Sequence, residues 1–265
     1  MRTLVGLGVA LALIAVGCGS AGPPRVVVAS GTTVVDSGLM ERLVDAYRGT
    51  GVDVNFSVVG AGTGEALALA AAGSVDLVVA HQRDLEEVFL AEHPEAFVEP
   101  VFSSTFLLVG PPGDPRSDGR TITELFAAVA TDAVPFVTRR DESGTYAKER
   151  EIWALTGVDP VGQEWYIETG QGMGFTLQVA DQRSAFALAE GGAYRTIAGE
   201  ISLVPIDVEA RPGLLENPYR AIVVDPDTGS AALGFVEWLR SDAGRRALIA
   251  ANQELYGDVV YSPAP

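Results

Sequence analysis

Along this chain, segments in which hydrophobic residues recur at helical spacing alternate with segments in which they recur at every second position. Apolar residues from Leu39 to Arg48 recur at helical spacing, whereas Val52 to Val58 alternates apolar and polar residues with a period of two. The first pattern predicts a helix with one buried face, and the second predicts a half-buried strand. The predicted strands are 25–29, 52–58, 76–80, 106–109, 136–138, 201–205 and 221–224. The predicted helices are 39–48, 65–72, 83–91, 124–131, 146–155, 174–190, 231–240 and 242–252.

Strands that alternate with helices are typical of α/β layers, so we expect mostly parallel sheets. Two segments, 102–109 and 202–208, are extended and lack a helical pattern. We expect them to be the two crossings between lobes. The first lobe would then contain residues 25–102 plus 207–265, and the second would contain 103–206. This layout is typical of a hinged binding protein with a ligand cleft between two α/β lobes.

The first residues predict a secretion signal and a lipid anchor. One positive charge precedes an apolar run from Leu4 to Val16, which is as long as a signal-peptide core and too short to span a bilayer. The run ends in small residues before Cys18, a pattern that resembles a bacterial lipobox. We expect residues 1–17 to be a signal peptide and residues 18–24 to form a tether lipidated at Cys18. The protein would then lie outside the cytoplasm, anchored to the membrane. The alternative is a cysteine placed there by chance.

The amino-acid composition excludes several classes of protein and of binding partner. The chain has 265 residues, with 18 Lys and Arg against 35 Asp and Glu, which gives a formal net charge of −17. Nucleic-acid binding requires a basic surface, so this surplus of carboxylates argues against such a partner. A hydrophobic fraction of 48% excludes a disordered chain. Because Cys18 is the one cysteine, internal disulfides and multi-cysteine zinc sites are excluded.

Candidate binding chemistry is concentrated in three loops that follow predicted strands. These are Ser30-Gly31-Thr32-Thr33, Gly62-Thr63-Gly64 and the segment from Arg139 to Thr145. In open α/β sheets, ligands bind at the carboxyl ends of the strands, where such loops meet. Backbone N–H groups at the start of a helix, Ser and Thr hydroxyls and an arginine together form an anion site. One such loop alone is an ordinary helix cap, but three together predict a shared site.

The predicted oxyanion-binding residues combine hydroxyl donors, one arginine and a glycine that allows close backbone approach. They are Ser30, Thr32, Thr33, Thr63, Arg139, Ser143, Gly144 and Thr145. We expect His81, Arg140 and Gln171 at the rim of the cleft. The acidic surface does not oppose a small anion there, because charges further away than the Debye length, about 8 Å, are screened.

Several stretches of the chain resemble one known family. Phe136 to Thr145 is similar to a family motif that reads Arg-Gly-Asp-Asp-Ser-Gly-Thr, and Trp165 to Gly174 is the most specific match. Ser30 to Leu39 and Val59 to Leu67 match two further segments, so the resemblance covers nearly the whole mature chain. The family is that of the tungstate-binding lipoproteins of ABC importers, in the type II class of periplasmic binding proteins. Arg140 stands where this family has a glycine.

The resemblance implies both a fold and a function. It implies an extracytoplasmic receptor with two α/β lobes, which captures tungstate, or next molybdate, and delivers it to the permease subunits of an ABC transporter. In the family motif the arginine and the threonine contact the oxyanion, and these correspond to Arg139 and Thr145 here. The resemblance implies no catalysis, no cofactor and no bound metal ion other than the metal of the cargo. We also expect a monomer.

Two other functions stay open on the residues alone. The same loops could bind another anion, such as phosphate or sulfate, with Asp141 or Glu142 accepting a proton from the ligand. A cell-surface enzyme for phosphoester or acyl transfer could use Arg139 with these two carboxylates, although the sequence pairs no nucleophile with a base. His81 and His93, with the glutamates between them, match no closed metal motif, so we expect no metal site there.

Overall fold

The computed structural model describes residues 22–117, 119–141 and 143–265. The predicted signal peptide and the predicted lipidation site Cys18 lie outside these ranges. None of the helices within them combines the length and the apolar composition that a bilayer crossing requires.

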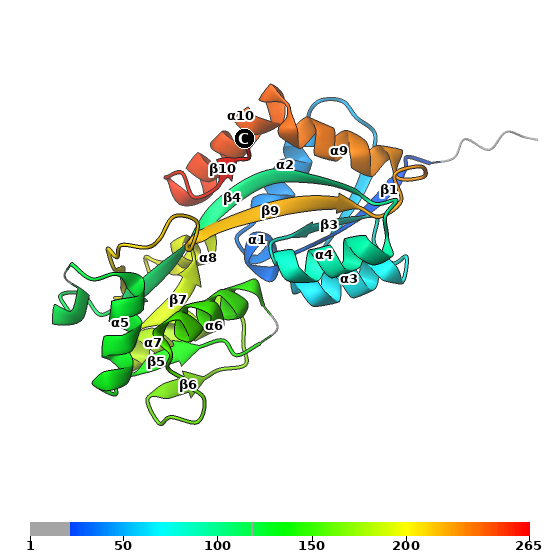
Figure 1. Cartoon of the computed structure of the whole chain (residues 1–265). Helices are drawn as coiled ribbons and strands as arrows, with labels where there is room; N and C mark the ends of the chain where they lie inside the picture. The colour runs from blue at the N-terminus through cyan, green and yellow to red at the C-terminus, as the bar shows by residue number, and fades with distance from the viewer. Residues whose placement is uncertain (1–21, 118, 142) are drawn as a thin grey trace, which may run out of the picture.

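Strands and helices alternate through most of the described chain, in the order that the two hydrophobic periods predict (Figure 1). The first part contains β1 (Arg25–Ser30), α1 (Thr32–Asp36), α2 (Leu39–Arg48), β2 (Asn55–Gly60), α3 (Thr63–Ala71), β3 (Leu77–Ala80), α4 (Arg83–Glu92) and β4 (Phe97–Gly110). The middle part contains the short 3-10 helix η1 (Pro115–Ser117), α5 (Ile122–Thr131), β5 (Phe136–Thr138), α6 (Gly144–Thr156), β6 (Tyr166–Glu168), α7 (Met173–Arg183), β7 (Ala187–Glu190), α8 (Gly191–Ile197) and β8 (Val204–Pro205). The last part contains β9 (Glu216–Val223), α9 (Ser230–Arg240), α10 (Asp242–Tyr256) and β10 (Ser262–Pro263).

The strands form mixed sheets, so the expectation of mostly parallel sheets is wrong. In the described ranges the main sheet has the order β10-β4-β9-β3-β1-β2, and β7 and β8 also pair with β4. β1 is parallel to β2 and β3, whereas β9 is antiparallel to both β3 and β4. The reason is the 14-residue strand β4, which pairs with β9 along its first part and with β7 from Phe106 to Val109. One long antiparallel strand therefore connects two smaller parallel arrangements.

One predicted helix is divided in the structure. The pattern predicts a helix over 174–190, but α7 ends at Arg183 and Ser184 adopts a positive φ of 49°. The residues Ala187–Glu190 form the strand β7 instead, and all four are buried. Alanine and leucine favour a helix locally, but pairing with β4 and complete burial override that preference.

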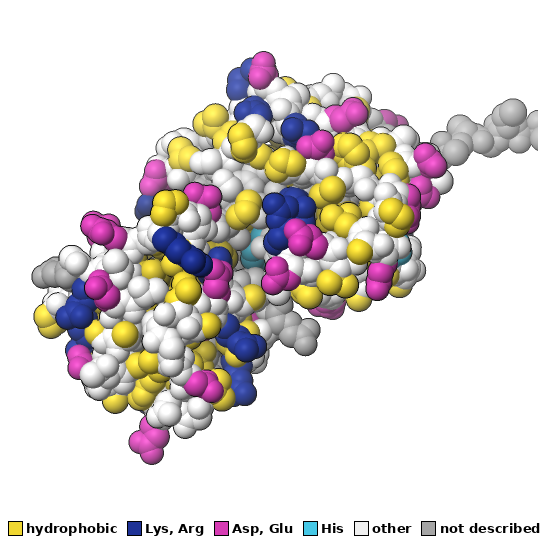
Figure 2. All heavy atoms as spheres, in the orientation of Figure 1, with side chains coloured by type: hydrophobic (Ala, Val, Ile, Leu, Met, Phe, Trp, Pro, Cys, Tyr) yellow, Lys and Arg dark blue, Asp and Glu magenta, His cyan; other side chains and the backbone are white. Residues whose placement is uncertain are grey.

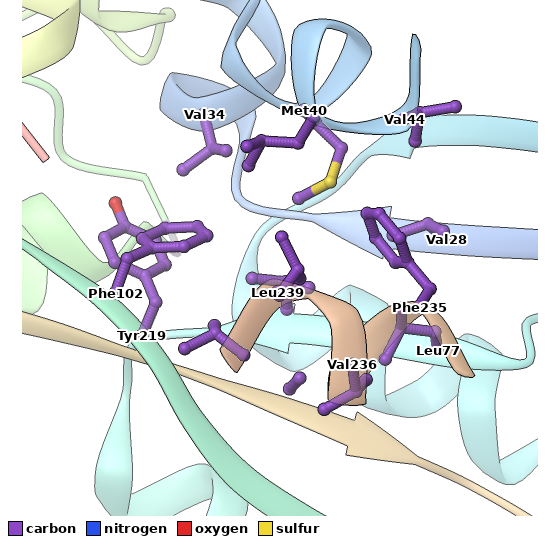
Figure 3. Packing of buried hydrophobic residues seen from close by; sticks show 14 of the residues in the cluster. Val28, Val34, Met40, Val44, Leu77, Phe102, Tyr219, Phe235, Val236 and Leu239 are labelled. Atoms are coloured by element: carbon purple, nitrogen blue, oxygen red, sulfur yellow. The ribbon is translucent and has the colours of Figure 1, made fainter. Parts of the chain in front are cut away.

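Buried hydrophobic residues gather in two halves of the molecule. The first half has clusters formed mainly by residues 26–102 and 219–261, including Met40, Tyr219 and Phe235 (Figure 3). We call it the β1 half; it contains β1 to β3, α1 to α4, α9 and α10. The β5 half has clusters formed by residues between Phe106 and Leu215, and it contains β5 to β7 and α5 to α8. Figure 1 shows β4 running from one half into the other.

The second crossing between the halves differs from the predicted segment 202–208. Ile206, Val208 and Leu214 all pack in a cluster of the β5 half. We therefore propose that the chain returns to the β1 half near Glu216, where β9 begins, rather than at residue 207. The first crossing, predicted over 102–109, falls within β4.

Candidate functional site

Two of the predicted loops meet at one edge of the β1 half. β2, β1 and β3 are neighbours in that order and run parallel, so their carboxyl ends lie together. Ser30 ends β1, Thr63 opens α3 after β2, and His81 follows β3. Ser30 is in register with Gly60 on one side and Val79 on the other. The alternation of strand and helix thus brings hydroxyl-bearing loops from separate parts of the sequence to one place.

The third loop comes from the β5 half. It follows β5 and leads into α6, whose first residue is Gly144. The ring of His81 packs between this loop and the first one. A Cβ added at Gly31 would lie 3.4 Å from His81 Nε2, and one added at Gly144 would lie 2.7 Å from the same atom. The two halves are therefore in close contact at His81, and the absence of a side chain at Gly144 makes that contact possible.

Five polar atoms of these loops are buried without a hydrogen-bond partner among the described residues. They are Ser30 Oγ, Thr33 Oγ1, Thr63 Oγ1, Thr145 Oγ1 and Arg139 Nη1. Each of these atoms can donate a hydrogen bond, and each residue exposes 4% of its surface or less. An unpaired buried donor costs about 1–3 kcal/mol, and a charged one costs more. Because folded proteins rarely leave such donors unpaired, the group indicates a binding site for a ligand rich in acceptor oxygens.

Arg139 is held in place by a neighbouring carboxylate. Its Nε and Nη2 donate to Asp141 Oδ2 at 2.9 and 2.6 Å, and Nη1 is the unpaired atom. The other carboxylate oxygen, Oδ1, accepts from the backbone N–H of Ser143 at 3.2 Å and from its hydroxyl at 2.5 Å. The loop therefore fixes the plane of the guanidinium and leaves one of its nitrogens for a ligand.

Ser143 makes its hydrogen bonds within the third loop. Its hydroxyl donates to Asp141 and accepts from the backbone N–H of Tyr146 at 3.3 Å, which caps α6. The hydroxyl proton is therefore used within the loop, and the role of Ser143 as a ligand donor stays a prediction. Gly144 and Thr145 are buried in the first turn of the same helix. Thr32 is half-buried in the first turn of α1.

His81 lies between the first and third loops and lines a pocket between the halves. Its Nδ1 is 2.7 Å from Asn217 Oδ1, and its ring stacks on Tyr219 with the centroids 4.7 Å apart. The amide nitrogen of Asn217 donates to Ser104 Oγ and to the Tyr219 hydroxyl, each at 3.1 Å. Burial lowers the pKa of His81 to about 4, and the charge of Arg139 acts in the same direction. Sequence reasoning missed Asn217, because only the pairing of β9 with β3 and β4 places it there.

The other two predicted rim residues have separate surroundings. Arg140 forms an ion pair with Glu168 and lines a pocket within the β5 half, beside Tyr146 and Arg150. Its guanidinium is turned toward Glu168, and its place at the rim stays a prediction. The φ of Arg140 is +43°, a conformation that glycine adopts without strain, which explains the glycine of the related motif. Gln171 is exposed and donates its backbone N–H to Thr169 Oγ1 at 3.4 Å; its place at the rim stays a prediction.

Two pockets open beside His81, and residues of both halves line each. The first has a volume of about 500 Å³, with His81 and Asn217 on one side and Gly144 and Lys148 on the other. The second has a volume of about 450 Å³, with Gly64, Gln82 and Leu85 facing Asp141, Ser143 and Tyr146. Figure 2 shows the groove between the halves on one face, with basic and acidic side chains along its edges. The residues that carry the five unpaired atoms line neither pocket, and each of these atoms exposes less than 1 Å².

The chemistry of this arrangement is hydrogen-bond donation. The loops of both halves supply hydroxyl groups and a guanidinium, and the carboxylate of Asp141 in the third loop is already engaged by Arg139 and Ser143. In the part of the chain that the structure describes, no three His, Cys, Asp or Glu side chains are grouped so that they could hold a metal ion. The site is therefore suited to an anion with several oxygens.

Known proteins with similar sequences and structures identify the family. The profile of the PBP superfamily domain matches residues 19–243. The tungstate-binding protein TupA of Peptoclostridium acidaminophilum is 30% identical over 274 residues, which cover 96% of this chain and 94% of that protein. A solved structure of the tungstate ABC transporter from Geobacter sulfurreducens is 32% identical, with a TM-score of 0.75 and coverage of 85% of this chain and 98% of that one. The structure of TupA from Desulfovibrio alaskensis is 27% identical, with a TM-score of 0.76 and coverage of 91% and 99%. This chain therefore belongs to the PBP superfamily, has its type II fold, and is a member of the same family as the TupA proteins.

Proposed function

We propose that this protein captures a tetrahedral oxyanion, tungstate first and molybdate next, and delivers it to the permease of an ABC transporter. The observation that carries the proposal is the group of five buried donors without partners, which come from loops of both halves. The names of the related proteins, two TupA proteins and a tungstate ABC transporter, support the choice of ligand.

Removing a dianion from water costs a large amount of free energy. Such an ion is bound in a buried site only if nearly all its oxygens accept hydrogen bonds. Ser30, Thr33 and Thr63 supply hydroxyls from the β1 half, and Arg139 and Thr145 supply donors from the β5 half. Because neither half holds all the donors, we propose that the halves close on the ligand. The fixed spacing of the donors would then select the size of the oxyanion.

Two alternatives have less support. Phosphate keeps a proton at neutral pH and needs an acceptor in the site, but both oxygens of Asp141 are engaged by Arg139 and Ser143, and Glu142 lies outside the described residues. The same engagement of Asp141 weakens the proposal of a phosphoester or acyl-transfer enzyme, since Asp141 would have to act as its base. We therefore infer that the protein is not an enzyme.

The first residues complete the proposal. We infer that Cys18 carries a lipid, that the mature protein is held outside the cytoplasm at the membrane, and that it acts as a monomer. Cells supplied with labelled palmitate should incorporate the label into the unmodified protein, and replacement of Cys18 by serine should abolish it. Absence of label from the unmodified protein would contradict the lipid anchor.

The ligand is tested by thermal unfolding of the protein without its first 21 residues, in the presence of different anions. We expect tungstate to raise the melting temperature most and molybdate next, with sulfate and phosphate having little effect. A ligand at a hundred times its Kd stabilises the folded state by about 2.7 kcal/mol, which is a shift of several degrees for a protein of this size. A shift with phosphate and none with tungstate or molybdate would reject the proposed ligand.

A further inference from the structure

We propose that His81 is a further ligand-contacting residue of this site and that it takes up one proton when a dianionic oxyanion binds. The inference rests on the proposed oxyanion-binding function. It adds a specific atom, His81 Nε2, to the donors described above, and it links affinity to pH.

The position of the ring is the first observation. The Nε2 edge of His81 lies against Gly31 and Gly144, the residues at which the first and third binding loops enter their helices. Ser30 and Thr145 are the immediate chain neighbours of these glycines, and both have a buried hydroxyl without a partner in the described chain. The imidazole edge is therefore next to loop residues whose chain neighbours carry donors in both halves. On the proposal, Nε2 reaches the anion that those donors hold.

The orientation of the ring is the second observation. Asn217 Oδ1 is 2.7 Å from His81 Nδ1, and the amide nitrogen of Asn217 donates to Ser104 Oγ and to the Tyr219 hydroxyl. Since the amide oxygen can only accept, Nδ1 carries the proton of the neutral ring and Nε2 carries a lone pair. A lone pair repels the oxygens of an anion that has no proton. Nε2 becomes a donor only when the ring is protonated.

The charges around the site supply the reason for proton uptake. Arg139 forms an ion pair with Asp141, so these two residues together add no net charge against a dianion. Arg140, the next positive group in the loop, is turned toward Glu168. A protonated His81 would supply the missing positive charge. In a site with an effective dielectric constant of about 20, a dianion about 4 Å away raises the pKa of an imidazole by several pH units.

The sign of the pH dependence follows from the two states of His81. Without ligand, burial lowers the pKa of His81 to about 4, so the ring is neutral at pH 7. With the dianion bound, the pKa lies above neutrality and the ring is charged. Binding therefore consumes one proton between these two pKa values, and Kd rises about tenfold for each unit by which the pH increases.

Other charged or titratable groups face His81 or lie close to the binding loops. They are Arg139 from the loop after β5, Tyr219 from β9, and the side chains that line the pocket beside the ring, namely Arg83 and Asp84 of α4, Lys148 and Glu151 of α6, and Glu216 of β9. Burial raises the pKa of Tyr219, so its hydroxyl stays neutral. Glu149, beneath the third loop, has a pKa raised to about 7 by burial, so the uptake of a proton is assigned to His81 by its loss in a His81 variant.

Isothermal titration with sodium tungstate tests the proposal. The binding enthalpy at pH 7 is measured in two buffers with different ionisation enthalpies, such as Pipes and Tris, which gives the number of protons taken up per anion. We expect about one proton for the unmodified protein, and a Kd that rises about tenfold per unit between pH 6.5 and 7.5. For His81→Gln, whose amide can still donate to Asn217, we expect no proton uptake and a Kd at pH 7 at least tenfold higher.

The chain offers a matched control in its other histidine. His93 lies at the end of α4, where it stacks on Phe89 and faces Glu95, so His93→Gln should keep the proton count and the affinity unchanged. Tungstate binding by the unmodified protein without proton uptake would overturn the inference, even if His81→Gln failed to fold. Unchanged affinity in a folded His81→Gln protein would also overturn it. Failure of the unmodified protein to bind tungstate or molybdate at all would instead reject the proposed function.

Discussion

At the scale of single residues, two adjacent arginines have opposite roles. Arg139 is buried and paired with Asp141 through two nitrogens, and its third nitrogen has no partner among the described residues, whereas Arg140 is exposed and paired with Glu168. We expect Arg139→Ala to raise the Kd for tungstate roughly 30- to 1,000-fold, because losing a charge-assisted contact and leaving Asp141 without its partner costs about 2–4 kcal/mol. Isothermal titration measures the change.

Arg140→Gly is the matched control for that substitution. It removes a positive charge one residue away but relieves the positive φ of 43°. We expect a tungstate Kd within about twofold of the unmodified value. The free energy of unfolding should change by no more than about 1 kcal/mol, since an exposed ion pair contributes little. A loss of affinity as large as that of Arg139→Ala would contradict the expectation that Arg140 makes no contact with the bound anion.

Glu149 beneath the third loop gives a prediction about pH and stability. It is buried, accepts from the Tyr166 hydroxyl at 2.5 Å, and has a pKa raised to about 7 by burial. In the unfolded chain its pKa is near the ordinary value of 4.5. The folded protein therefore loses stability as the pH rises from about 4.5 to 7, by about 2–3 kcal/mol in total. Glu149→Gln keeps an acceptor oxygen without the charge, so its advantage over the unmodified protein should grow by that amount in urea titrations.

The exposed Glu151 on the same helix provides the comparison for Glu149. Its carboxylate pairs with Lys148 and Arg211 at the surface. Glu151→Gln should change the free energy of unfolding by less than about 1 kcal/mol, with no comparable growth between pH 4.5 and 8. If the two variants responded alike to pH, the buried carboxyl would not be the source of the effect.

At the scale of elements, local sequence patterns predict the secondary structure that depends on neighbouring residues. They fail where pairing with a distant strand determines the secondary structure or the position of a side chain. The periodicity of residues 39–48 corresponds to α2, and the hydroxyls of Ser30 and Thr63 stand at strand ends as predicted. The strand β7 was predicted as helix, because its burial depends on β4, about 80 residues earlier. Asn217 was missed for the same reason: only the pairing of β9 with β4 places it beside His81.

The junction of β4 with the segment before β7 can be tested at Gly110. A Cβ added there would lie 2.6 Å from two ring carbons of Phe186, which is fully buried and has no room to move. We expect Gly110→Ala to lower the free energy of unfolding by about 1–3 kcal/mol through overpacking, measured by the urea midpoint. Gly199→Ala is the control, because a Cβ there meets no atom within 4 Å. Equal stability of the two variants would contradict the tight packing between β4 and Phe186.

At the scale of the whole molecule, binding depends on how closely the two halves approach each other. Gly144 of the β5 half is in contact with His81 of the β1 half, and an added Cβ would lie 2.7 Å from Nε2. Each half has its own hydrophobic clusters, so Gly144→Ala should leave the melting temperature of the ligand-free protein within about 2 °C of the unmodified value. The methyl group should nevertheless hold the halves apart, and donors that no longer reach the anion should raise the Kd for tungstate at least tenfold.

Small-angle scattering separates this effect of Gly144→Ala from a merely local one. With saturating tungstate, the radius of gyration of the variant should exceed that of the unmodified protein, because the groove between the halves stays wider. Gly172→Ala, at the start of α7, adds the same methyl group where no atom lies within 4 Å, and it should match the unmodified protein in both measurements. Gly144→Ala would contradict the argument if it bound tungstate with unchanged affinity and an unchanged radius. The contact between His81 and Gly144 would then be incidental, and the donors of the two halves would converge on the anion without it.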